Sequence, residues 1–145
     1  MKYSLPLSSI HIDDPYWNRY TSLIPGKVIP YQWEILNDKL PGVPPSHCLR
    51  NFRIAAGDEK GQRQGMAFQD SDAAKWLEAV AYSLAIRPDP ELEKTADELI
   101  TLIGRAQEAN GYLNTYFTLN YPRKNGKTLQ RVTSFTAPGT SLRRP

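Results

Sequence analysis

Residues 71–109 constrain the fold most, because they hold two amphipathic stripes joined by a short proline-containing connection. Apolar side chains recur at helical spacing in both halves, and so short a connection leaves consecutive helices antiparallel and adjacent. We therefore expect a helical hairpin that is capped by Asp70 or Ser71, restarts at Asp89 and ends near Asn110. The stripes consist of Ala73, Trp76, Leu77, Val80, Ala81 and Leu84, followed by Leu92, Ala96, Leu99, Ile100, Ile103 and Ala106.

Proline and glycine divide the residues before this hairpin into short segments. Asp14 before Pro15 is a helix-start signal, and we expect a helix over residues 15–23 that ends at Pro25 and Gly26. Further helices are expected from about residue 30 and over residues 46–56, and Gly57 is expected to end the second of these. Residues 3–12 alternate loosely and predict a short strand or an extended lead-in.

Composition narrows the class of protein. A chain of 145 residues fits one globular domain. The net charge of +3 comes largely from basic residues in the last 23 positions, so it is weak support for a nucleic-acid partner, and we expect none. The single cysteine, Cys48, excludes an internal disulfide and favours a cytoplasmic location. We see no signal peptide and no apolar run long enough for a membrane span, and we expect no membrane partner.

Two short segments hold candidate substrate-binding residues. Gln69 and Asp70 precede the first stripe, where a carboxylate either caps the helix or shapes a sugar pocket. Asn110 and Tyr112 lie where the second helix opens into a loop, and a tyrosine there either stacks on a sugar or packs behind a left-handed cap. Capping and packing are the structural alternatives to these two binding roles.

His47 and Cys48 are neighbours, which suggests a metal or thiol–imidazole site at first sight. Adjacent side chains seldom point at one site, and two ligands do not close a zinc site. We therefore assign Cys48 to packing, predict no metal ligand in this chain, and place His11 at the surface or in packing.

Five segments carry a resemblance to a known family. Together they resemble, in order, the beta-L-arabinofuranosidases of glycoside hydrolase family 127, over about residues 8–135. The resemblance implies an all-α fold: a partial alpha/alpha six-hairpin barrel, truncated after its first few helices. The segments are VIPYQWEILND (28–38), NFRIAAG (51–57), GMAFQDSDAAKWLEAVAYSLA (65–85), PDPELEKTADELITLIGRAQEANGYLNTYF (88–117) and QRVTSF (130–135).

The final segment, TAPGTSLRRP (136–145), departs from the family pattern. Family members resemble YCAGHLIEAA at about this point, and a DNA sequence that spells those letters also spells TAPGTSLRRP when read one base later. We expect residues 8–135 to be the N-terminal part of the catalytic barrel and residues 136–145 to be a frameshifted tail. An ordinary C-terminal tail is the alternative.

The resemblance also implies a mechanism. Family members use a zinc-bound cysteine as nucleophile and a glutamate as acid/base on an arabinofuranoside, and the corresponding residues lie beyond this chain, so no residue here inherits a catalytic role. We expect the chain alone to be an inactive N-terminal fragment, without a cofactor of its own. Two alternatives are a small helical binding or scaffold module and a complementing half of a split enzyme. We also expect self-association through an exposed barrel surface that includes Trp17, Trp33, Leu99 and Ile103.

Overall fold

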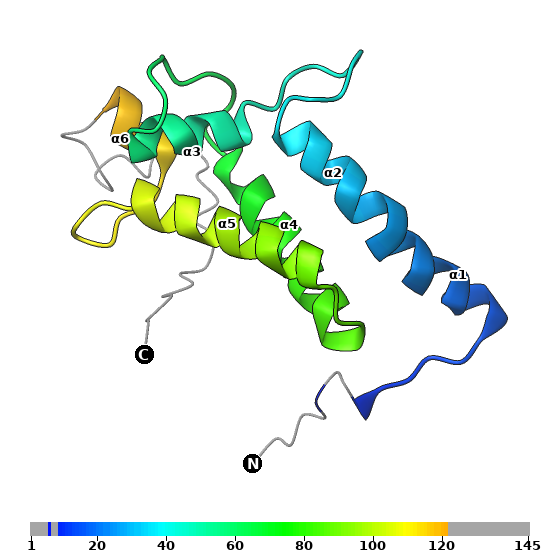
Figure 1. Ribbon diagram of the computed structural model, residues 1–145. Coiled ribbons are helices and arrows are strands. Elements are labelled where there is room, and N and C mark those ends of the chain that lie inside the picture. Colours follow the sequence, from blue (N-terminus) through cyan, green and yellow to red (C-terminus); the bar gives the residue numbers. More distant parts are fainter. Residues whose placement is uncertain (1–5, 7–8, 122–145) are drawn as a thin grey trace.

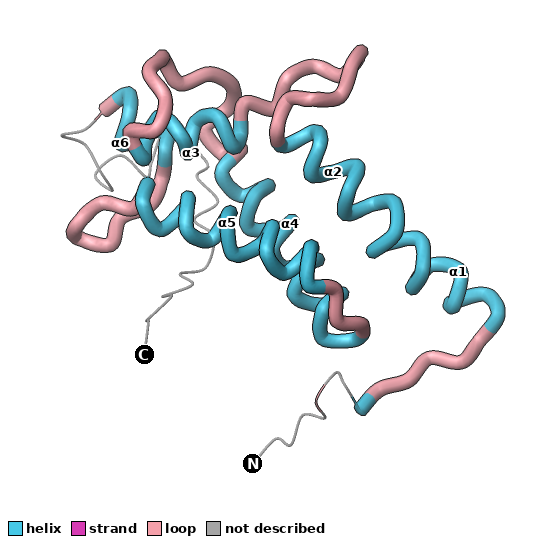
Figure 2. Tube along the Cα trace, in the orientation of Figure 1, coloured by secondary structure: helices cyan, strands magenta, loops and turns pink. Residues whose placement is uncertain are grey.

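The computed structural model describes residue 6 and residues 9–121, and every regular element among them is helical (Figures 1 and 2). The all-α class predicted from the sequence is therefore confirmed for this part of the chain. Half of the expected lead-in at residues 3–12 and the whole of residues 136–145 lie outside the described residues. The elements are α1 (Pro15–Leu23), the π-helical turn η2 (Ile24–Val28), α2 (Ile29–Leu36), α3 (Cys48–Ala56), α4 (Asp70–Ile86), α5 (Pro90–Ala106) and α6 (Thr115–Asn120).

Helices α4 and α5 form the predicted antiparallel hairpin (Figure 1). The Asp89 side chain caps α5 by accepting hydrogen bonds from the backbone N–H groups of Glu91 and Leu92, both at 3.1 Å. The predicted end near Asn110 is wrong, because Gln107 already takes an extended backbone conformation with ψ 135°. The loop after α5 is therefore longer than expected.

The first helices form one continuous rod rather than two pieces separated at Pro25. Asp14 caps α1 as predicted, accepting from the backbone N–H groups of Tyr16 and Trp17 at 2.9 Å. The predicted break is wrong, because a π-helical turn lets the chain pass through Pro25 and Gly26 without ending the helix. A proline removes one N–H and crowds the preceding turn, and a wider turn accommodates both effects.

The core lies where α2, α3, α4 and α5 meet. Trp76 of α4 stacks on Trp33 of α2 with ring centroids 4.5 Å apart, and its Nε1–H donates to the Ile29 carbonyl oxygen at 3.0 Å. The expected exposure of Leu99 is therefore wrong, because Leu99 is 1% exposed, and Trp33 and Ile103 are partly buried against the core. The fully or largely buried apolar residues of these helices are Ile29, Leu36, Cys48, Leu49, Phe52, Ala73, Trp76, Val80, Ala96, Leu99, Leu102 and Ala106.

Helix α3 packs across α5 and α4 at one end of the hairpin, and the short helix α6 packs on α3 (Figure 1). Gly57 ends α3 in a left-handed conformation with φ 81°, as expected from its position. The buried Asn51 fastens the following polar loop, because its side chain donates to the Gln64 carbonyl at 2.9 Å and accepts from the Gln64 N–H at 3.1 Å. None of the helices in the described ranges combines the length and the hydrophobicity that crossing a bilayer requires.

Candidate functional site

Asp70 lies in the first turn of α4 and holds the start of α6. Its carboxylate accepts hydrogen bonds from the backbone N–H of Thr115 at 2.6 Å and from the Thr115 hydroxyl at 2.7 Å. Thr115 is 1% exposed, so this pair is a buried bridge between segments 45 positions apart. The predicted capping of α4 by Asp70 or Ser71 is wrong, because the capping position belongs to Gln69 and carries no side-chain hydrogen bond.

Gln69 forms two hydrogen bonds at the loop that leads into α4. Its side-chain Oε1 accepts from the Met66 N–H at 2.9 Å, and its backbone carbonyl accepts from the Cys48 thiol at 3.1 Å. The loop turns at Gly65, whose φ of 82° favours glycine, and a Cβ there would displace the Gln69 amide. Gln69 therefore positions the entry to α4 from both its side chain and its backbone.

Arg63 completes the group around Asp70, and no sequence pattern singled it out within its polar loop. Its guanidinium carbon lies 5.0 Å from the centre of the Tyr116 ring, a cation–π arrangement. The guanidinium also donates to the backbone carbonyls of Gly65 and Met66, whereas its Nε is buried without a hydrogen-bond partner among the described residues. Arg63 thus links the loop before α4 to the first turn of α6.

The electrostatics of this group follow from its partial burial. Burial raises the pKa of the Asp70 carboxyl above its ordinary value, while the hydrogen bonds from Thr115 and the charge of Arg63 act in the opposite direction. Burial also lowers the pKa of Arg63, against the influence of Asp70. In the Asp70–Thr115–Arg63–Tyr116 group, hydrogen bonds and opposite charge therefore offset only part of the cost of burying Asp70 and Arg63. We call this group the α6 anchor.

Asn110 and Tyr112 lie in the tight loop between α5 and α6. The Asn110 Oδ1 accepts from the Tyr112 N–H at 2.8 Å across Gly111, whose φ is 86°. Glu108 closes the loop by donating its N–H to the Tyr112 carbonyl at 2.9 Å and joins it to α6 by accepting from the Thr118 hydroxyl at 2.8 Å. The four predicted substrate-binding residues therefore fall into two pairs, and each pair lies in a segment that is hydrogen-bonded to α6.

Cys48 and His47 serve separate structural contacts. The Cys48 thiol is fully buried, and desolvation, followed by the charge of Asp70, raises its pKa to about 12. A nucleophile or zinc ligand must be a thiolate, so this protonated thiol fits neither role. His47 has a left-handed backbone with φ 57° and donates its N–H to the Asp38 carboxylate at 2.9 Å.

The residues in the described ranges do not fit a zinc site. No three His, Cys, Asp or Glu side chains come together there in a group that could hold a metal ion. A structural or catalytic zinc needs three or four such ligands. This part of the chain therefore offers no donor set for the zinc that the family resemblance implies.

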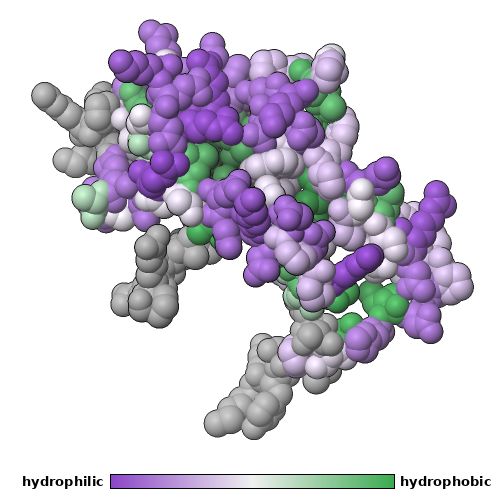
Figure 3. Space-filling view, in the orientation of Figure 1, coloured by the Kyte–Doolittle hydropathy of each residue, from purple (hydrophilic) through white to green (hydrophobic). Residues whose placement is uncertain are grey.

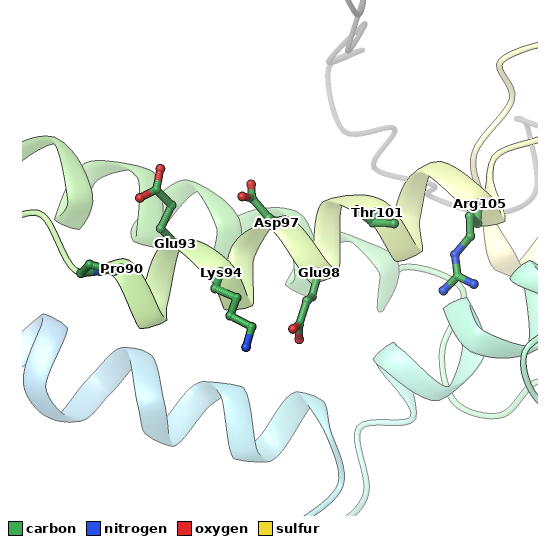
Figure 4. A pocket seen from close by; sticks show the side chains of 7 residues that line it. All are labelled: Pro90, Glu93, Lys94, Asp97, Glu98, Thr101 and Arg105. Carbon is green, nitrogen blue, oxygen red and sulfur yellow. The ribbon is translucent and has the colours of Figure 1, made fainter.

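A surface hollow lies elsewhere, along one face of α5 (Figure 4). It has a volume of about 550 Å³ and is lined by Pro90, Glu93, Lys94, Asp97, Glu98, Thr101 and Arg105. Figure 4 shows Glu93 and Asp97 on one side of the helix and Glu98 on the other, so the charged groups do not converge. Arg105 is already bound to Asp58 through two contacts of 2.7 Å. We interpret the hollow as a solvated helix face, because none of the predicted site residues lines it.

Comparison with known proteins finds relatives of this chain by sequence. The sequence profile described as "Beta-L-arabinofuranosidase, GH127 catalytic domain" matches residues 9–136. A non-reducing end beta-L-arabinofuranosidase from Bifidobacterium longum subsp. longum is 41% identical, over 77% of this chain and 19% of that protein.

Solved structures show the same helical arrangement. A GH127 beta-L-arabinofuranosidase from Geobacillus stearothermophilus T6 matches with a TM-score of 0.80 and 56% identity, over 82% of this chain and 19% of that chain. A second GH127 beta-arabinofuranosidase matches with a TM-score of 0.70 and 26% identity, over 91% of this chain and 20% of that chain. The chain thus spans about a fifth of the length of these relatives.

Proposed function

The chain belongs to the GH127 beta-L-arabinofuranosidase family, and we propose that it supplies the first helices of a catalytic domain that hydrolyses beta-L-arabinofuranosides. In this role it provides a scaffold and the supports of the substrate pocket, and the reacting groups come from elsewhere in such a domain. The observation that carries the proposal is the close structural match to the Geobacillus enzyme over 82% of this chain but only 19% of that one.

The chemistry of the described residues supports a scaffold role. Glycoside hydrolysis needs an acid/base and a nucleophile aimed at one anomeric carbon. The only cysteine is a buried thiol with its proton engaged to the Gln69 carbonyl. The Asp70 carboxylate accepts two hydrogen bonds from Thr115. Zinc would therefore be held by residues of the catalytic domain outside the described part of this chain.

The substrate-binding roles of Gln69, Asp70, Asn110 and Tyr112 are part of the proposal. Each pair lies in a segment that holds α6, so these residues would set the position of α6 and of the loop before it at the rim of the sugar pocket. Carbohydrate is the partner this proposal implies. A cytoplasmic location, and the division into residues 8–135 of the family domain and a frameshifted tail at 136–145, stay predictions.

The sequence allows two other functions: a small helical binding or scaffold module and a complementing half of a split enzyme. The second is a variant of the proposal, because it places the same helices against the rest of a family domain. The α1–η2–α2 rod exposes apolar side chains, among them Trp17, which is 56% exposed. A free-standing module would leave this apolar surface in water, so that alternative is disfavoured.

The experiment is an activity assay on these 145 residues alone. Incubated with zinc and an aryl beta-L-arabinofuranoside, the chain should release no more of the aryl group than a buffer blank, because its thiol is buried and protonated. Turnover that disappears in Cys48→Ser would overturn the proposal, since the residue assigned to packing would then perform the chemistry.

A further inference from the structure

The α1–η2–α2 rod exposes a continuous apolar stripe. Its members recur at helical spacing over four turns, and their exposed fractions run from 39% to 61%. The first three are aromatic and contact one another, with ring centroids 5.1 to 6.0 Å apart. We call Tyr16, Trp17, Tyr20, Leu23, Ile24, Val28 and Tyr31 the outer stripe.

The outer stripe lies away from the chain's own core. Ile29 and Trp33 face α4, where Trp76 covers both of them. Tyr31 is two positions along the helix from Ile29 and from Trp33, a rotation of about 200°, so it lies on the opposite face. Tyr31 is 50% exposed. A helix that is apolar on opposite faces is typical of the interior of a larger protein. The rod therefore has one face that α4 covers and one that the described residues (6 and 9–121) leave exposed.

The outer stripe is about as large as the largest apolar patch that a soluble monomer usually leaves exposed. Seven large apolar side chains, each about half exposed, present on the order of 600 Å², at the upper limit for the largest patch of a typical soluble monomer. Helix α1 contributes most of them and has no buried residue of its own. Figure 3 shows further hydrophobic residues at the surface where α1 lies beside the α4–α5 turn, on the hairpin side of the rod.

We propose that the outer stripe is the docking surface for the remaining part of a GH127 catalytic domain, which would cover it with an apolar helix face. This inference rests on the proposed function. The helices keep the arrangement they have in the Geobacillus enzyme, with a TM-score of 0.80, while they make up 19% of that chain. Most of that chain is thus available to pack around the same rod, which favours this occupant over a second copy of the present chain.

The test uses a chimera of this chain with the Geobacillus enzyme. Residues 9–121 replace the matching segment of the Geobacillus enzyme, and Trp17→Gln with Tyr20→Gln is made both in this chimera and in the free 145-residue chain. The chimera should lose at least about 4 °C in melting temperature, because two buried aromatic side chains become polar. The free chain should melt at an unchanged temperature. Trp17→Phe with Tyr20→Phe keeps the apolar area and should retain most of the chimera's stability.

Each result decides between the occupants. An active chimera that tolerates the two glutamines without loss would overturn the inference while leaving the proposed function intact. A free chain that dimerises in sedimentation, and becomes monomeric only with the glutamines, would also overturn it if the chimera is unaffected, because the occupant is then a second copy. An unsubstituted chimera that fails to fold or to cleave substrate would instead count against the proposed function.

Discussion

Substituting Asp70 by alanine should destabilise the chain by about 2–4 kcal/mol. The change removes two hydrogen bonds to a carboxylate and leaves the N–H and hydroxyl of the buried Thr115 without that acceptor. Such bonds contribute roughly 1.5–3 kcal/mol each, and relief of the carboxylate's own desolvation offsets part of the loss. Urea unfolding followed by tryptophan fluorescence measures the effect, because Trp33 and Trp76 stack in the core.

Two variants give this measurement its controls. Asp72→Ala removes a neighbouring carboxylate that forms an exposed ion pair with Lys75 at 3.3 Å, and it should cost less than about 0.5 kcal/mol. Thr115→Val deletes the hydroxyl but keeps the backbone bond to Asp70, and it should cost about 1 kcal/mol. If Asp70→Ala is as mild as Asp72→Ala, or its effect adds to that of Thr115→Val without coupling, the α6 anchor does not hold α6 as described.

Three further outcomes follow from the same contacts. Because the folded pKa of Asp70 is raised above 3.8, the folded state binds its proton more strongly than the unfolded state does. The stability of the chain relative to Asp70→Asn should therefore fall as pH rises above 3.8, and a rise in urea titrations would contradict this. The Cys48 thiol, with its pKa raised to about 12, should react with a thiol reagent at pH 8 only after unfolding, so rapid labelling of the folded chain would refute its burial. Trp76→Phe loses the bond to the Ile29 carbonyl and should cost about 1–2 kcal/mol by urea unfolding, whereas the exposed Trp17→Phe should cost almost nothing.

The sequence predicted those parts of the fold that depend on neighbouring residues. Asp14 and Asp89 cap the helices that they were expected to start, and Gly57 ends α3, because each acts on backbone groups within a few positions. The helical hairpin followed from periodicity and a short connection. The continuous rod did not, since Pro25 and Gly26 ordinarily end a helix and only a π-helical turn carries the chain past them.

The candidate site was less accessible to sequence reasoning. Asp70 was identified, but its local role as a cap was wrong, because its partner Thr115 lies 45 positions away in a helix too short to predict. Arg63 gave no signal within a polar loop, and only the fold brings it over the Tyr116 ring. The expected exposure of Leu99 was wrong for a related reason: α3 packs on α5, a contact that periodicity alone does not specify.

The most direct test of the account is the catalytic efficiency of the chimera. Residues 9–121 of this chain, in place of the matching segment of the Geobacillus stearothermophilus enzyme, should give kcat/KM on an aryl beta-L-arabinofuranoside within about tenfold of the unmodified enzyme, a difference of about 1.4 kcal/mol in the barrier. That result would show that these helices serve as the scaffold of a GH127 catalytic domain. A chimera that folds and yet cleaves no more substrate than the free chain would contradict it.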